Sequence, residues 1–336
     1  MTDSELLKQY GSFAELWQEI PKSSEVNYEK GAYLDLFEDC LFESADEKVG
    51  TLRYYVYDPV KHGMPENGTY PVIFCLHGAG HSLPRKIGIN WSSMEHFASQ
   101  EYQEKMGGAY IVVPFANEKS VGDKTEGTWM TPVPGEDFPG YTEEEIKNIA
   151  ALGGSKEERF IRLCGHNSIY TDTLFALLKT VCAGFTSAGD TFLFGTSAGG
   201  YSAWRMLITA PETFRACMLM SAAYRPSEKE VRQTIASGVP VWFYHGLHDE
   251  IVPFDLIVAP NLKLYEAAEN FSLFLPEIVR HANGKAASNI SGSGIEMGQH
   301  CTNDIVGEDL MFDDGTPMDP RHPAGVTGWI RSFGER

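Results

Sequence analysis

Short blocks of apolar residues recur along the chain and read as strands. In the first block, GTLRYYVYDP, apolar and polar positions alternate, whereas four of the later blocks are continuous apolar runs. Continuous runs of this length are typical of strands that are buried on both faces of a parallel sheet. We therefore predict strands within residues 50–59, 70–78, 109–115, 190–195, 214–222 and 239–246.

Helix-like stretches separate these strands, at residues 93–106, 170–185 and 200–214. Strands that alternate with helices predict an α/β fold with a mostly parallel central sheet flanked by helices. Residues 1–45 are expected to form a helical extension, with one or two short amphipathic helices before Pro21. No period of 20–50 residues repeats, which argues against solenoids and propellers.

Residues 117–168 interrupt this alternation, because they are rich in glycine, proline and charge. A segment this long within a compact domain is usually a lid or a substrate-shaping insertion. No change of composition marks a second core, so we predict one domain, residues 1–336, with this insertion as its cap. Trp129, Phe138 and Tyr141 within it, and Trp91 before it, could line an apolar pocket or simply pack.

The composition narrows the choice of partners. The chain carries 46 acidic and 27 basic residues, a net charge of −19, and this excess disfavours nucleic acids and anionic membranes as partners. No apolar run is long enough to span a membrane, and the first residues lack a signal-peptide pattern. The six cysteines are scattered without a CxxC pair, so we expect reduced thiols and a cytoplasmic protein.

The segment TFLFGTSAGGYSAW places Ser197 between a strand-like run and a helix-like run, with Gly195 and Gly199 on either side. A G-x-S-x-G segment in this context is typical of a sharp turn that exposes a nucleophilic serine. A serine that only caps the helix is the alternative. Nucleophilic attack would also require donors for the developing oxyanion, a general base, and an acid that holds the base.

The oxyanion donors are sought in the turn that ends the strand VIFCLHGAGH. We expect the backbone N–H groups of Ala79 and Ala198 to serve, with that of Gly80 as a possible third donor. An ordinary turn at the end of a strand is the alternative. His77 belongs to the same turn and is a candidate substrate contact, as is Thr196 beside the serine.

The acid is predicted to be Asp249, which follows a strand in the segment VWFYHGLHDEIVPF. Carboxyl ends of parallel strands gather at one edge of a sheet, so this carboxylate can approach the serine. Glu250 and Asp304 are rival acids. We expect Glu250 to point away, and Asp304 is close in sequence to the predicted histidine.

The base is predicted to be His300, in the loop EMGQHCTND. The chain order serine, acid, histidine leaves His281 and His322 as rivals. His281 ends a run that looks helical, where a positive charge would suit the helix C-terminus. His322 lies in a proline-rich tail.

These segments resemble the α/β-hydrolase superfamily over roughly residues 50 to 305. The resemblance rests on LHGAG at 76–80, GTSAGG at 195–200, HGLHDEIVP at 245–253 and the His300 loop. Within the superfamily the chain looks most like the polyhydroxybutyrate-depolymerase and feruloyl-esterase-like carboxylesterases. Tannase-type members join cysteines that flank the serine and the histidine, but Thr196 stands where the first of these would be, so only Cys301 is present.

The resemblance implies a serine carboxylesterase that cleaves small aryl, acyl or hydroxycinnamoyl-type esters without a metal or organic cofactor. Two alternatives remain: a serine peptidase of the prolyl-oligopeptidase type, for whose propeller domain this chain is too short, and an inactive ligand-binding homologue.

Overall fold

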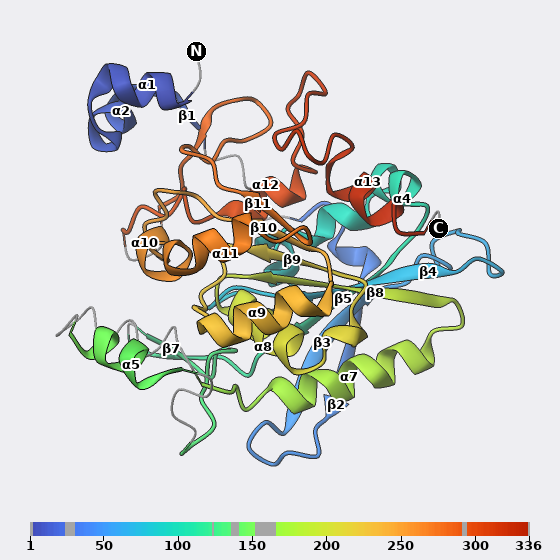
Figure 1. Ribbon diagram of the computed structural model, residues 1–336. Coiled ribbons are helices and arrows are strands. Elements are labelled where there is room, and N and C mark those ends of the chain that lie inside the picture. Colours follow the sequence, from blue (N-terminus) through green and yellow to red (C-terminus); the bar gives the residue numbers. More distant parts are fainter. Residues whose placement is uncertain are drawn as a thin grey trace.

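An eight-stranded sheet forms the centre of the molecule (Figure 1). The computed structural model describes residues 3–23, 31–122, 124–135, 141–151, 166–290 and 294–334. The strand order is β11-β10-β9-β8-β4-β5-β3-β2, and only β3 and β2, at one edge, run antiparallel to their neighbours. The prediction of a mostly parallel sheet is confirmed. The strands are β2 (Glu38–Glu43), β3 (Thr51–Tyr57), β4 (Tyr70–Leu76), β5 (Tyr110–Phe115), β8 (Ala188–Thr196), β9 (Ala216–Met220), β10 (Val241–Tyr244) and β11 (Phe271–Phe274).

Both faces of this sheet are covered, which explains the continuous apolar runs. In β8, Leu193 contributes to one apolar cluster and Phe194 to the other, and neither is exposed. Helices pack over both clusters, on opposite faces of the sheet (Figure 1). They include α7 (Thr171–Gly184), α8 (Ala198–Thr209) and α9 (Glu228–Ser237) on the first face, and α4 (Gln100–Met106) and α13 (Gly325–Arg331) on the second.

Three details differ from the sequence predictions. The edge strands β2 and β11 were not predicted, and β2 lies inside the extension that was expected to be helical. The helix expected over residues 93–106 is divided at Ser99, whose hydroxyl caps α4 by accepting from the Tyr102 amide. The run that ends at His281 is not helical, because Arg280 instead bridges to Ala286 as extended chain.

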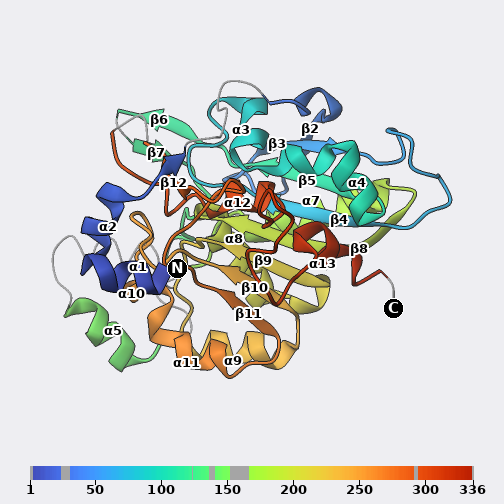
Figure 2. The ribbon, with the colours of Figure 1, turned by 90° about the horizontal axis from the view of Figure 1, so that it is seen from above.

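The N-terminal segment forms two helices, α1 (Asp3–Tyr10) and α2 (Phe13–Glu19). It continues into β1 (Lys22–Ser23), which pairs in parallel with β12 (Ala286–Ala287). The Phe13 ring of α2 also stacks on His248, with ring centroids 3.8 Å apart. The segment therefore contacts both the residue before Asp249 and the strand that leads toward His300 (Figure 2).

The described parts of the 117–168 insertion contain a hairpin and a helix: β6 (Lys119–Val121), β7 (Lys124–Glu126) and α5 (Glu143–Ala150). Tyr141 lies against the core, where its hydroxyl donates to the Arg225 carbonyl. Phe138, a predicted pocket residue, lies outside the described residues, as does Cys164. Within the described residues no helix is both long and apolar enough to cross a membrane.

Candidate active site

Ser197 occupies a sharp turn between β8 and α8. Its backbone angles, φ +50° and ψ −117°, lie in a region that residues with a side chain rarely adopt. Hydrogen bonds hold the turn: the Ser197 amide donates to the Met220 carbonyl at 3.0 Å, and its carbonyl accepts from the Ala223 amide at 2.9 Å. The turn thus presents the Ser197 side chain to a pocket at the edge of the sheet.

The glycines around Ser197 are required by close packing. A Cβ at Gly199 would come within 2.0 Å of the Leu76 carbonyl oxygen, and one at Gly195 within 2.6 Å of the Ala203 Cβ. Both distances are too short for real atoms. The first two turns of α8 therefore lie directly against the ends of β4 and β8, which brings Ser197 close to the turn after β4.

We expect Ser197→Gly to be more stable than Ser197→Ala by about 1 kcal/mol, because glycine adopts a positive φ without strain. Chemical denaturation of the two variants measures this difference. The same comparison at Ser202, in the interior of α8, is the control and should favour alanine by a similar amount. Equal stability of the two Ser197 variants would show that the turn stores no strain.

His300 and Asp249 form a buried pair. The His300 Nδ1 lies 2.8 Å from one carboxylate oxygen of Asp249 and 3.0 Å from the other. The second oxygen, Oδ1, also accepts the backbone N–H groups of Ile251 at 2.9 Å and Val252 at 2.7 Å. The carboxylate is thereby fixed by the turn after β10 and orients the imidazole.

The pKa of Asp249 lies below its ordinary value. Burial alone would raise this pKa, but the charge and hydrogen bond of His300 outweigh it, with further help from His245 and the Val252 amide. Asp249 is therefore a carboxylate at neutral pH and favours an Nδ1-protonated imidazole at His300.

Gln299, which the sequence analysis missed, holds the histidine loop. Its side chain is fully buried, donates to the Ala287 carbonyl at 3.1 Å, and accepts from the Val279 amide at 2.7 Å. Gly298 beside it approaches the Ala287 carbonyl so closely that a Cβ would lie 2.1 Å away. β12 is consequently the support of the His300 loop.

The rival histidines and acids lie elsewhere or have other partners. His281 follows extended chain and so caps no helix, and it is buried with its Nδ1 2.7 Å from the Glu308 carboxylate. The His322 ring packs at a tilt against Trp242, with ring centroids 3.9 Å apart. Asp304 lines the pocket floor instead of pairing with His300, and accepts from the Ser93 hydroxyl at 3.3 Å.

Glu250 lies next to Asp249, and its Oε1 accepts from the Gln299 amide at 3.3 Å. Burial, and secondarily the charge of Asp249, raise the pKa of Glu250 to about 7, although that amide and His300 oppose the shift. The folded protein therefore binds a proton here between about pH 4.5 and 7 that the unfolded chain releases.

It follows that Glu250 costs the folded state stability as the pH rises through this window. We compare the free energy of unfolding of Glu250→Gln with that of the unmodified protein at each pH. We expect this difference to favour the variant by about 1 kcal/mol more at pH 8 than at pH 5. The figure allows for solvent screening of a partly exposed group. Urea unfolding at both pH values measures it. A difference between the two proteins that does not change with pH would contradict the assignment.

Two of the three predicted oxyanion donors, Ala79 and Gly80, belong to the turn after β4, and the third, Ala198, begins α8. Ala79 is exposed at this turn, and among the described residues no acceptor bonds its N–H or that of Ala198. The Gly80 N–H, in contrast, donates to both carboxylate oxygens of Glu118, at 3.0 and 3.1 Å. Because Glu118 occupies this amide, Gly80 is not a third donor in this conformation.

His77 has a structural position. Its Nδ1 donates to the Gly78 carbonyl at 2.6 Å, and its Nε2 accepts from the Ala116 amide at 3.0 Å. Burial keeps the ring neutral by lowering its pKa. Trp129 packs 5.0 Å from this ring and is also fully buried. We therefore assign His77 and Trp129 to the core and not to substrate contact.

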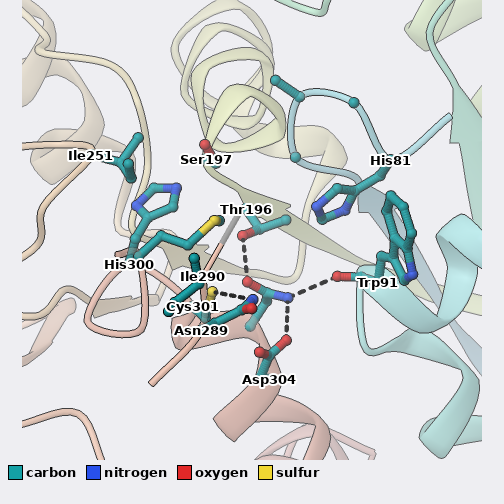
Figure 3. Close-up of a pocket in the computed structure, with 15 residues that line it drawn as sticks. His81, Trp91, Thr196, Ser197, Ile251, Asn289, Ile290, His300, Cys301 and Asp304 are labelled. Atoms are coloured by element: carbon teal, nitrogen blue, oxygen red, sulfur yellow. Dashed lines mark hydrogen bonds between the residues drawn. The ribbon is translucent and has the colours of Figure 1, made fainter. Parts of the chain in front are cut away.

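Ser197, His300 and the oxyanion turn border a single pocket with a volume of about 480 Å³ (Figure 3). Trp91 and Thr196, two predicted substrate contacts, also line it. The other lining residues come from the turn after β4, the turn after β10 and the chain on either side of His300. They are Gly78, Ala79, Gly80, His81, Ile251, Asn289, Ile290, Met297, Cys301, Asn303 and Asp304.

Asn303 connects the floor of this pocket. Its side chain accepts from the Thr196 hydroxyl at 3.3 Å and donates to the Trp91 carbonyl and to Asp304, each at 2.9 Å (Figure 3). Cys301 contributes a free thiol, and burial raises its pKa far above the ordinary value. No group of three metal-binding side chains occurs in the described part of the chain.

Comparison with known proteins supports the architecture. No protein-family model matches the chain, and no curated protein matches its sequence. A solved thermostable esterase matches its structure with a TM-score of 0.51 and 15% identity, over 83% of this chain and 61% of the esterase. The chain has the α/β-hydrolase fold. The match spans less than two thirds of that esterase's length.

Two further structures are similar at lower TM-scores. The BES protein from Bacillus cereus matches with a TM-score of 0.46 and 16% identity, over 71% of this chain and 87% of that one. A ferulic acid esterase matches with a TM-score of 0.44 and 15% identity, over 71% of this chain and 90% of that one. Identities and TM-scores this low say nothing about activity or substrate.

Proposed function

We propose that this protein is a serine hydrolase that cleaves carboxylic esters. The observation that carries the proposal is that Ser197, in a strained turn, borders the same pocket as an imidazole whose Nδ1 is held by the buried carboxylate of Asp249. This arrangement leaves the opposite nitrogen of His300, Nε2, as the base.

In the acylation step, the Ser197 hydroxyl oxygen attacks the ester carbonyl carbon while the His300 Nε2 takes its proton. The carbonyl oxygen becomes an oxyanion that accepts hydrogen bonds from the Ala79 and Ala198 amides. Collapse of the tetrahedral species breaks the bond to the alcohol, and His300 returns the proton to the departing oxygen. Asp249 stabilises the imidazolium formed in between.

In the deacylation step, a water molecule attacks the acyl-serine, and His300 again accepts and then returns a proton. The acid is released and the Ser197 hydroxyl is restored. Every proton in this cycle is carried by groups of the chain, the substrate or water. A pocket of about 480 Å³ suits a small acyl or aryl group, and Trp91, Ile251 and Met297 provide apolar contacts.

A fluorophosphonate probe tests the proposal, because it reacts covalently with activated serines. We expect one modified peptide, containing Ser197, and faster turnover of p-nitrophenyl acetate and butanoate than of the matched p-nitroanilides. Modification of another residue would remove the nucleophile assignment. Faster cleavage of the anilides would instead favour the peptidase alternative.

A further inference from the structure

His81 is a titratable residue in the pocket for which the proposed mechanism has no role. It directly follows the oxyanion turn and is partly exposed, and its ring enters the pocket from the side opposite His300 (Figure 3). The Trp91 ring lies edge-on to it, with centroids 6.0 Å apart. A histidine in this position can contact a bound substrate.

The hydrogen bonds around His81 determine which of its nitrogens carries the proton. Its Nδ1 lies 3.2 Å from the Ser92 hydroxyl oxygen. That hydroxyl donates its only proton to the Gly88 carbonyl at 2.8 Å, so it can only accept from His81. The Nδ1 is therefore protonated.

The ring as a whole is neutral. Burial, and then the nearby rings of His77 and His300, lower the pKa of His81 to about 3. A neutral ring with a proton on Nδ1 has a lone pair on Nε2. Among the described residues, no donor bonds that Nε2.

We propose that His81 is a specificity-determining residue whose Nε2 accepts a hydrogen bond from a hydroxyl group of the substrate. The proposal rests on the proposed esterase function and narrows it to hydroxyl-bearing esters. The rest of the lining agrees with this preference, since the described residues that border the pocket include the Asp304 carboxylate and no lysine or arginine. An acceptor that lines the pocket favours a substrate that can donate to it and disfavours one that leaves it unpaired once bound.

A substrate–variant cycle tests this. Two series of esters are used: p-nitrophenyl phenylacetates, substituted on the ring of the acyl group, and phenyl acetates, substituted on the ring of the alcohol. In each series the 2-, 3- or 4-position of that ring carries either a hydroxyl or a fluorine. Fluorine is similar in size to a hydroxyl but cannot donate a hydrogen bond. The measurement is the hydroxyl-to-fluorine ratio of kcat/KM in the unmodified protein, divided by that in His81→Phe. This quotient cancels intrinsic reactivity. We expect this quotient to be about 5 to 10 for at least one position of the hydroxyl, as the loss of one hydrogen bond would give.

Further variants separate recognition from folding. Ser92→Ala removes the group that fixes the tautomer, so we expect it to lower the same ratio partway without contacting substrate. His62→Phe, at an exposed histidine that stacks on Tyr57, is the matched control and should give a quotient of one. A quotient of one for His81→Phe at every position, in a protein that still hydrolyses esters through Ser197, would overturn the proposal while leaving the esterase function intact.

Discussion

Replacing Ser197 by alanine is expected to lower kcat for ester hydrolysis by at least about 10⁴-fold, because the proposed acyl intermediate forms on the Ser197 hydroxyl oxygen. The turn is held by hydrogen bonds of the Ser197 backbone to the Met220 carbonyl and the Ala223 amide, and these bonds do not use the side chain. The variant should therefore fold and still bind substrate. Steady-state kinetics with p-nitrophenyl butanoate and a thermal unfolding curve measure both properties.

The matched control is Ser202→Ala, the same change one turn further along α8. Ser202 donates to the Trp129 carbonyl at 3.1 Å and does not line the pocket. We expect it to lose some stability and to keep its kcat. If Ser197→Ala kept more than a tenth of the activity, another nucleophile would have to be sought.

The second large effect is expected for Asp249→Asn, which should lower kcat by about 10⁴-fold at neutral pH. The Ile251 and Val252 amides both donate to Oδ1, so they would hold the carbonyl oxygen of the new side chain in that place. Its NH₂ group would then face the Nδ1 of His300. The Nδ1 of His300 would then have to accept a hydrogen bond, so the ring would carry its proton on Nε2. A protonated Nε2 cannot take the proton of the Ser197 hydroxyl.

Glu250→Gln makes the same change one residue later and serves as the control, with kcat expected within about threefold of the unmodified protein. The expected loss in Asp249→Asn should appear in kcat more than in KM, since the pocket itself is unchanged. A variant that loses only stability, with kcat intact in the folded fraction, would reduce Asp249 to a structural residue.

The sequence predicted the parts of the site that local chemistry specifies. The turn at Ser197 requires glycines on both sides because the chain packs closely there. The spacing of these glycines around the serine can therefore be recognised in the sequence. The Asp249–His300 contact could be predicted because chain order and strand ends leave few candidates. The structure places this pair in direct hydrogen-bond contact.

Other parts depended on partners that are distant in sequence. Nothing around Gly80 indicates that the carboxylate of Glu118 occupies its amide. His77 and Trp129 looked like pocket residues because polar and aromatic side chains near a turn often are, but here they pack against each other in the core. Gln299 and Asn303 carried no local signal, since their importance comes from hydrogen bonds to chain segments far away.

The pairing of β1 with β12 joins residues 22–23 to residues 286–287. During synthesis, β1 has no partner until more than 260 further residues have emerged, as the register Lys22↔Ala286 requires. The Ala287 carbonyl of β12 also accepts a hydrogen bond from Gln299. The support of the His300 loop is therefore formed by two segments that lie far apart in the sequence. We therefore expect the His300 loop to reach its final position late in folding, after the Ser197 turn has been synthesised.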